Sequence, residues 1–339
     1  MAITIEDIAR EAGVSISTVS RVMNGTKSVS DALKDRVYQS IEKNNFKPNV
    51  LAQGLITKKT NVLGVVVPDI SNAVFGALTK GINSVCSRKG YTLMVCESGG
   101  ILENEVRLLK VLEDRCADGV LFAGVDVNHA LVSAIKSRSY PVVLVTQEAS
   151  EGENLIPTVV HDNVQALYDA VNFLIDNGHR RIAYIGGPKH DFSSGKKRLQ
   201  GYLAALRDAG IEKVDSYIVQ GAFSYDAGYS GMKKIYEENS VLPTAAVTGS
   251  DVIALGAIQF AKNAGLDVPN DLSFLGFDDL DFSCYFKPEL STVRISYFDE
   301  GAAAARELIQ RIDGPQGDNG TIYVPHKIIR RGTVKNRHP

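Results

Sequence analysis

The 339-residue sequence contains no tryptophan and only four cysteines, Cys86, Cys96, Cys116 and Cys284. The cysteines lie far apart, with no C-x-x-C pair and no histidine at the spacing of a metal ligand. This pattern favours free thiols in a reducing compartment over a disulfide framework or a zinc site. The sequence therefore predicts neither a secreted disulfide scaffold nor a metalloprotein.

Long apolar runs are absent as well. The longest apolar stretches, such as residues 62–67, are strand-sized, whereas a membrane-spanning helix needs about 18 apolar residues. The amino terminus, Met-Ala-Ile-Thr-Ile-Glu-Asp, lacks the basic and apolar segments of a signal peptide. With 44% hydrophobic and 22% charged residues, the composition is that of a globular protein. We therefore expect a cytoplasmic protein with no membrane partner.

The motifs of common enzyme and cofactor sites are also missing. No G-x-G-x-x-G precedes a predicted helix, and the segment 187–197 has neither the spacing nor the Ser/Thr of a phosphate-binding loop. No G-x-S-x-G is present. His161, His179 and His190 are not spaced as metal ligands. The sequence predicts a protein that is not an enzyme and has no cofactor.

Charge is unevenly distributed along the chain. Residues 1–59 carry nine Lys/Arg against six Asp/Glu, a net charge of +3, although the whole chain has a net charge of −2. The remaining residues therefore carry a net charge of −5. A basic amino-terminal segment followed by an acidic remainder favours a polyanion as partner of that segment alone.

The first fifteen residues have the period of a helix that ends in a tight turn. Apolar residues recur with the i, i+3, i+4, i+7 spacing of one helix face, at Ile5, Ile8, Ala9 and Ala12. Thr4 precedes this face as a candidate N-cap, with Asp7 three residues later. Gly13 then interrupts the pattern, because glycine readily adopts the left-handed backbone of a turn between helices.

Two further helices are predicted after this turn, over residues 17–24 and from Ser30 to about residue 44. Two helices joined by a short glycine-containing turn, with a third in support, form a helix-turn-helix motif. The second helix presents short polar side chains and Arg21, groups that bind DNA phosphates and base edges. The alternative is a three-helix cap whose polar face is only solvated.

The amino-terminal segment closely resembles a known family over some twenty residues. From Thr4 to Gly25 it reads TIEDIAREAGVSISTVSRVMNG, which is similar to the head of the lactose-repressor/galactose-repressor family of bacterial transcription regulators. The resemblance implies that Ile16, Ser17 and Arg21 contact DNA bases. It also implies contacts to the DNA backbone, or support at the edge of the DNA site, from Thr4, Ser15, Thr18, Ser20 and Asn24.

The segment from Lys47 to Leu55 resembles the hinge of the same family. It is long enough for a helix of barely two turns, which is unstable alone in water, and Gly54 weakens it further. The family uses this segment as a hinge helix that orders on operator DNA. The resemblance implies DNA contacts from Asn49, Ala52 and Leu55, with Ala52 and Leu55 in the minor groove. Packing of Leu55 on the rest of the chain is the alternative.

Beyond residue 60, short β-branched runs alternate with helix-length segments as far as residues 272–275. Such alternation predicts parallel sheets covered by helices on both faces. We therefore expect an α/β fold with an amino-terminal three-helix head. The resemblance implies a two-lobed, periplasmic-binding-protein-like body of doubly wound parallel sheets.

The resemblance also divides the chain into parts. It implies a helix-turn-helix domain over 1–46, a hinge over 47–60 and an effector-binding and dimerisation domain over 61–339. The first lobe is expected at about 61–160 and 292–321, and the second at about 161–291 and 322–339. Dimer contacts are expected near residues 71–98 and 251–284.

Ligands of open parallel sheets bind beyond the carboxyl ends of the strands. Arg198, in the segment RLQGY, and Asp278, in GFDD, match the arginine and the aspartate of the family's pocket, a pair suited to sugar hydroxyls. The resemblance adds five effector-binding residues, Ser71, Asn72, Phe75, Phe223 and Ser250. The alternatives are a salt bridge between the lobes for Arg198 with Asp278, and core packing for Phe75 and Phe223.

These observations predict a homodimeric transcription regulator, most often a repressor in this family, that binds a palindromic DNA operator. A sugar-like effector is expected to change the closure of the lobes and the spacing of the hinges. One alternative is a global catabolite regulator whose co-effector is a phosphorylated carrier protein. Another is a stand-alone sugar-binding module, which the head and the missing signal peptide disfavour.

Overall fold

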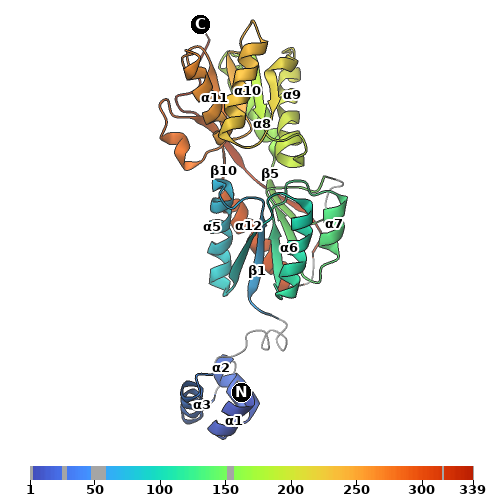
Figure 1. The fold of residues 1–339 in the computed structure, drawn as a ribbon, viewed down its shortest axis with the longest axis vertical. Coiled ribbons are helices and arrows are strands. Elements are labelled where there is room, and N and C mark those ends of the chain that lie inside the picture. Colours follow the sequence, from blue (N-terminus) through green and yellow to red (C-terminus); the bar gives the residue numbers. More distant parts are fainter. Residues whose placement is uncertain (1–2, 25–28, 47–58, 151–155, 315–316, 339) are drawn as a thin grey trace. The chain divides into compact units, whose positions relative to one another are not determined.

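The computed structural model describes residues 3–24, 29–46, 59–150, 156–314 and 317–338. The chain separates into two compact units, Met1–Thr60 and Asn61–Pro339 (Figure 1). The predicted hinge residues Asn49, Ala52 and Leu55 lie outside the described residues.

The first unit contains three helices, α1 (Ile5–Ala12), α2 (Ile16–Asn24) and α3 (Asp31–Lys43). Thr4 caps α1 as predicted, because its hydroxyl accepts a hydrogen bond from the Asp7 N–H at 3.3 Å. The Asp7 carboxylate in turn accepts from the Thr4 N–H at 3.0 Å, which completes a capping box. Gly13 has a φ of 61°, the left-handed turn that the sequence predicts. The second helix begins one residue earlier than expected.

A small apolar core joins the three helices and fixes the start of α2. Its buried residues are Ile8, Ala9, Ala12, Val19, Val22 and Val37. Polar contacts also tie the end of α1 to α3. The Arg36 guanidinium donates to the Ala12 carbonyl, and Lys43 Nζ lies 2.6 Å from Glu11 Oε1. The end of α1, from which the turn into α2 begins, is therefore held in place by α3.

The second unit is built from two lobes, each around a six-stranded sheet (Figure 1). The first sheet has the order β11-β5-β4-β3-β1-β2 and is parallel throughout. The second has the order β12-β10-β9-β8-β6-β7, and only β12 is antiparallel to its neighbour. This arrangement confirms the predicted fold class, a helical head and two α/β lobes.

The first lobe consists of β1 (Val62–Val67), α5 (Ala73–Cys86), η1 (Ser87–Lys89), β2 (Thr92–Glu97), α6 (Leu102–Asp114), β3 (Gly119–Phe122), α7 (His129–Lys136), β4 (Val142–Val145), β5 (Thr158–His161), α12 (Tyr297–Asp313) and β11 (Thr321–Val324). Helices α5 and α12 pack together on one side of the sheet, and α6 and α7 lie together on the other side (Figure 1).

The second lobe consists of α8 (Asn163–Asp176), β6 (Ile182–Gly186), η2 (Phe192–Lys197), α9 (Arg198–Asp208), η3 (Asp215–Tyr217), β7 (Ile218–Gln220), α10 (Tyr225–Glu238), β8 (Ala245–Thr248), α11 (Asp251–Asn263), β9 (Ser273–Asp278), η4 (Asp281–Cys284), β10 (Ser291–Ile295) and β12 (His326–Ile329). Helices α8 and α9 pack as one pair, and α10 and α11 as another. A single helix was expected over 195–209, but a π-helical segment, η2, precedes α9 there.

The chain passes between the lobes three times, after β5, after β10 and after β11. Strand β10 pairs with β9 in the second sheet, so the chain re-enters the first lobe after Ile295. This is a few residues later than the expected return at 292. The reason is that residues 292–295, which were expected in the first lobe, belong to β10 of the second sheet. The carboxyl-terminal tail also belongs to the second lobe, where the Phe274 N–H donates to the Thr333 carbonyl at 2.8 Å.

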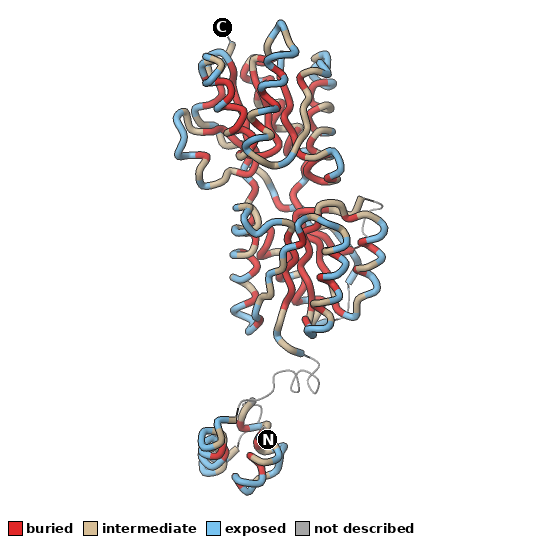
Figure 2. Tube along the Cα trace, in the orientation of Figure 1, coloured by how far each residue is buried: buried red, intermediate tan, exposed pale blue. Residues whose placement is uncertain are grey.

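Buried residues follow the strands in both lobes (Figure 2). All residues of β3, β4, β5, β6, β8 and β9 are buried, as expected for parallel strands covered on both faces. Edge strands β2 and β7 are only partly buried. No helix in the described ranges has the length and apolar character needed to cross a membrane.

Candidate functional site

Helix α2 presents an exposed face made of residues that the sequence predicts to bind DNA. Ile16 is 46% exposed, and Ser17 and Arg21 are also exposed. Within the described residues, the Arg21 side chain has no hydrogen-bond or ion-pair partner. An exposed apolar side chain and an exposed guanidinium on this helix match the groups that read base edges.

Hydroxyl groups surround the first turn of the same helix. Ser15 Oγ lies 2.8 Å from Ser17 Oγ and 2.9 Å from Thr18 Oγ1, and it accepts from the Thr18 N–H at 3.2 Å. No acidic residue lies in this turn. Hydroxyls and N–H groups at a helix start, without a carboxylate, form a surface that accepts a phosphate. The geometry thus brings Ser15, Ser17 and Thr18 together.

The other residues predicted to contact DNA differ in their location and exposure. Ser20 is half-buried on α2, and Thr4 is exposed but is engaged in the capping box of α1. Asn24 is the last residue of α2. Thr4 therefore has a structural role as the N-cap of α1, whether or not it also contacts DNA.

A cavity of about 360 Å³ lies between the two lobes. Six of the seven predicted effector-binding residues line it, namely Asn72, Phe75, Arg198, Phe223, Ser250 and Asp278. They come from helix starts and strand ends: Asn72 and Ser250 cap α5 and α11, Arg198 begins α9 and Asp278 ends β9. Ser71 is not among the lining residues. It is exposed, and its hydroxyl donates to Asp69 at 2.6 Å.

Arg198 is 3% exposed and is held by three hydrogen bonds. Its Nε donates to Asn163 Oδ1 at 2.7 Å, one Nη donates to the Gly249 carbonyl at 2.6 Å, and the other lies 3.2 Å from His161 Nε2. The guanidinium also stacks over the Phe277 ring at 3.7 Å. These contacts orient the arginine towards the cavity without a carboxylate partner in the described part of the chain.

The predicted pairing of Arg198 with Asp278 takes a different form. Both residues belong to the second lobe, and no ion pair joins them within the described ranges, so the alternative of a salt bridge between lobes is wrong. Asp278 Oδ1 instead accepts from the Tyr297 hydroxyl of the first lobe at 2.6 Å. Burial raises the pKa of the Asp278 carboxyl to about 7, although the charge of Arg198 opposes this shift.

The two lobes are also joined through η2, which ends at Lys197, the residue before Arg198. The backbone N–H of Glu148, in the first lobe, donates to Ser193 Oγ in η2 at 3.0 Å. The Glu148 carboxylate forms an ion pair with Lys197 Nζ at 2.7 Å. With the Tyr297–Asp278 bond, these contacts hold the two walls of the cavity together.

Sequence reasoning missed several polar residues of the cavity wall, namely Thr146, Gln147, His161, Asp191, Ser194 and Tyr297. Gln147 Oε1 has no hydrogen-bond partner among the described residues, and burial raises the pKa of Asp191. His161 is 1% exposed and its Nδ1 lies 3.1 Å from the Glu300 carboxylate. Thr146, Gln147 and His161 directly follow or end β4 and β5, so the rule that ligands bind beyond strand ends was the available signal.

A buried acid supports the first-lobe loops of the cavity. Glu105, in the first turn of α6, is 2% exposed, and burial raises its pKa to about 7, while hydrogen bonds from Val125 and Ser98 oppose this shift. The folded protein therefore binds a proton that the unfolded chain, with a pKa near 4.5, releases. The contribution of Glu105 to the free energy of unfolding therefore falls as the pH rises from about 4.5 to about 7.

We accordingly expect Glu105→Gln to stabilise the protein above neutral pH. The predicted gain is about 3 kcal/mol at pH 8 and less than about 1 kcal/mol at pH 5. Thermal and denaturant unfolding at the two pH values measure it. Glu103→Gln, on the exposed side of the same helix, is the matched control and is expected to change little. Equal gains at both pH values would show that the carboxyl does not titrate as described.

A helix-turn-helix unit joined to two α/β lobes around a polar cavity defines a DNA-binding regulator with a ligand-binding domain. The family model "Bacterial regulatory proteins, lacI family" matches residues 4–49, and the model "Periplasmic binding protein-like domain" matches residues 171–334. The chain is 38% identical to catabolite control protein A of Priestia megaterium, over 99% of this chain and 100% of the relative. The chain belongs to the lacI family of DNA-binding transcription regulators, whose members are not enzymes.

Solved structures agree with this assignment. A complex of the transcriptional regulator CelR with cellobiose aligns with a TM-score of 0.76 and 27% identity, over 98% of this chain and 99% of that one. A lac repressor dimer bound to operator and the anti-inducer ONPF aligns with a TM-score of 0.86 over 99% of this chain and 100% of that one. At 24% identity, the second comparison supports the fold alone.

Proposed function

We propose that this regulator is a cytoplasmic homodimeric repressor of carbohydrate-utilisation genes, controlled by a small sugar-like effector in the interlobe cavity. The observation that carries the proposal is the cavity itself, where a buried arginine, a buried aspartate and two aromatic rings converge from both lobes. The complex of the similar regulator CelR with cellobiose supports a sugar as the class of effector.

The polar groups of the cavity suit vicinal hydroxyls. The three bonds of Arg198 use three of its five N–H groups, which leaves two that can donate to ligand oxygens. Asp278 supplies an acceptor, while Phe75 and Phe223 offer apolar surface to the face of a sugar ring. Asn72, whose Oδ1 caps α5, retains its amide N–H groups as donors.

The effector would act through closure of the lobes. Asp278 bonds Tyr297 at the cavity wall, and Glu148 bonds Ser193 and Lys197 between the lobes. A ligand whose affinity differs between states with and without these contacts shifts the lobe equilibrium. The predicted hinge residues Asn49, Ala52 and Leu55 would carry the change to the DNA. The predicted domain limits of 1–46, 47–60 and 61–339 remain part of this proposal.

Homodimer formation would use the first-lobe edge within the predicted contact region 71–98. A hollow of about 460 Å³ lies there between α5 and the edge strand β2. Val95 of β2 is 43% exposed, and nearby Ile70 is 62% exposed, so apolar surface is available for a second copy. Two-fold symmetry of such a dimer requires a two-fold symmetric operator.

Capture of sheared genomic DNA by the purified protein tests the proposal. We expect enrichment of one palindromic sequence located beside carbohydrate-utilisation genes, and a change in its retention when the matching sugar is added. In the first unit, the residues proposed to contact DNA are Thr4, Ser15, Ile16, Ser17, Thr18, Ser20, Arg21 and Asn24. A palindrome beside unrelated genes, unaffected by sugars, would contradict the carbohydrate assignment while leaving the regulator class intact.

The similarity to catabolite control protein A favours one second candidate, a catabolite-control regulator with a phosphorylated carrier protein as co-effector. Binding assays distinguish the two. A sugar response that is lost on changing Arg198 supports the cavity effector, whereas a carrier protein that strengthens operator binding in the same variant supports the second candidate. The lacI-family match over residues 4–49 excludes a stand-alone sugar-binding module.

A further inference from the structure

The end of β9 forms a strained turn at the wall of the cavity. Asp278 and the next residue, Asp279, have φ angles of 112° and 59°. These values lie in the left-handed region, which residues other than glycine rarely adopt. Two such residues in succession persist only where the surrounding structure holds them in place.

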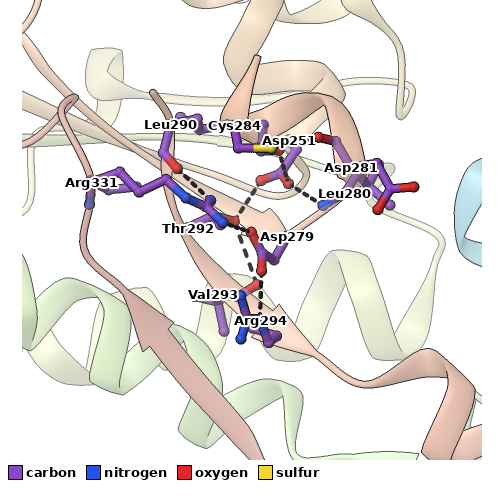
Figure 3. A network of polar contacts seen from close by, with 12 residues as sticks. Asp251, Asp279, Leu280, Asp281, Cys284, Leu290, Thr292, Val293, Arg294 and Arg331 are labelled. Atoms are coloured by element: carbon purple, nitrogen blue, oxygen red, sulfur yellow. Dashed lines mark hydrogen bonds and ion pairs between the residues drawn. The ribbon is translucent and has the colours of Figure 1, made fainter. Parts of the chain in front are cut away.

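Asp279 has the contacts needed to hold this turn (Figure 3). Its carboxylate is 7% exposed and lies between two arginines. Oδ2 accepts from Arg294 Nε at 2.5 Å, and Oδ1 lies 2.6 Å from an Nη of Arg331, as an ion pair without the angle of a hydrogen bond. Removing one carboxylate would therefore release two charged partners.

Both arginines are fixed to the second sheet. Arg294 lies on β10, opposite Asp278 in the strand register. Arg331 follows β12, where it donates from Nη to the Leu290 carbonyl at 2.8 Å and from its N–H to Ser291 Oγ at 2.8 Å. The carboxylate of Asp279 thus connects the end of β9 to β10 and to the carboxyl-terminal tail.

Asp279 itself does not line the cavity, whereas its two neighbours do. Asp278 lines the cavity and accepts a hydrogen bond from the Tyr297 hydroxyl. On the other side of Asp279, the Leu280 N–H donates to Asp251 Oδ2 at 2.8 Å (Figure 3). The turn is therefore fixed on both flanks, and Asp279 supplies the contact at its centre.

We propose that Asp279 is a positioning residue of the effector cavity, whose ion pairs with Arg294 and Arg331 hold the left-handed turn that presents the Asp278 carboxylate. The expected effect of Asp279 on effector affinity rests on the proposed function. The expected effect of Asp279 on the conformation of the turn does not. Without the carboxylate, a residue with a side chain relaxes to negative φ, which displaces Asp278 from the Tyr297 hydroxyl and from the nearby charge of Arg198. Glycine accepts the left-handed backbone without that penalty.

Comparison of Asp279→Ala with Asp279→Gly tests the proposal, because both remove the carboxylate and only alanine opposes the turn. The full-length protein is labelled with 13C at aspartate, and Asp278 is titrated by NMR and assigned through loss of its signal in Asp278→Asn. The groups that face it are Arg198 from α9, Asp251 from α11 and Tyr297 from α12. Asp281→Ala, at an exposed acid of the same loop, is the control.

We expect the alanine variant to lower the pKa of Asp278 by about 1 unit or more as the carboxyl gains water, and the glycine variant to stay close to wild type. In the protein with Asp279 intact, Arg331→Gln should lower the pKa of Asp278 as Asp279→Ala does. In the Asp279→Gly variant, the same change should leave the pKa of Asp278 unaltered. Equal shifts in the alanine and glycine variants would overturn the proposal, since loss of charge alone would then explain both.

Effector affinity supplies the second measurement. The probe is the sugar that most raises the melting temperature of wild type among cellobiose, maltose, glucose and galactose. We expect about a tenfold or larger loss of affinity in Asp279→Ala, against a loss of less than about threefold in Asp279→Gly. If none of the four sugars binds wild type, the proposed effector class fails, and the titration still decides the role of Asp279.

Discussion

Arg21→Ala is expected to reduce specific operator affinity to the level of non-specific DNA binding. The guanidinium is exposed on α2 and has no partner in the described part of the chain, so it is free to bond a guanine with two hydrogen bonds. Such a pair discriminates by about 1–3 kcal/mol, and the proposed homodimer would present two of them. The expected loss is therefore about 2–6 kcal/mol, or roughly 30-fold to more than 10,000-fold.

Fluorescence anisotropy with the captured palindrome and with a scrambled duplex measures this effect. Arg10→Ala is the matched control, because Arg10 is an exposed cation of α1 that pairs with Asp7 at 3.4 Å. It is expected to weaken both duplexes slightly and equally, since it removes charge without a base contact. If Arg21→Ala lost the same small amount on both duplexes, Arg21 would be a phosphate contact and base reading would belong to other residues.

Arg198→Lys is expected to abolish the response to the effector while operator binding persists. Lysine retains the charge but not the planar guanidinium that bonds Asn163 and Gly249 and that would bond the proposed effector at the same time. Losing two charged hydrogen bonds to ligand oxygens costs about 3–6 kcal/mol, which corresponds to at least about a hundredfold loss of affinity. Operator binding should survive because the first unit, with its own core, is unchanged.

Isothermal titration with the selected sugar and anisotropy with operator DNA separate the two effects. Arg207→Ala is the control, since Arg207 lies on the same helix α9 but pairs with Asp208 on the surface. A melting curve of each variant shows whether the lobes remain folded. Should Arg198→Lys bind the sugar as tightly as wild type in a folded protein, the cavity would not be the effector site.

Much of the first unit could be predicted from the sequence because its contacts are local. The capping box at Thr4, the left-handed turn at Gly13 and the buried face of Ile8 and Ala12 follow from spacing within one or two turns of helix. The contact of Arg36 with the carbonyl of Ala12 could not be predicted, since 24 residues separate the partners and no periodic pattern relates them.

The candidate cavity was predictable in its main residues but not in its bonding. The resemblance brought Arg198, Asp278 and Phe223 to one site, and the structure places all three around the same cavity. It gave no indication that Asp278 bonds Tyr297 of the other lobe, or that Ser71 turns away to Asp69. The first outcome depends on how the two sheets face each other. The second is a contact between residues two positions apart in one loop, and the resemblance carried no information about it.

By itself the sequence determined the class of fold, the helix-turn-helix head and the family. Each of these is encoded in local periodicity, in turn residues and in short runs of matching residues, which are properties of neighbouring positions. Only the tertiary structure decided which polar groups partner Arg198 and Asp278, where the chain returns to the first lobe, and that Asp279 is held between Arg294 and Arg331. Those features join residues at least 15 positions apart in the sequence, and the packing of the strands, rather than any local pattern, brings them together.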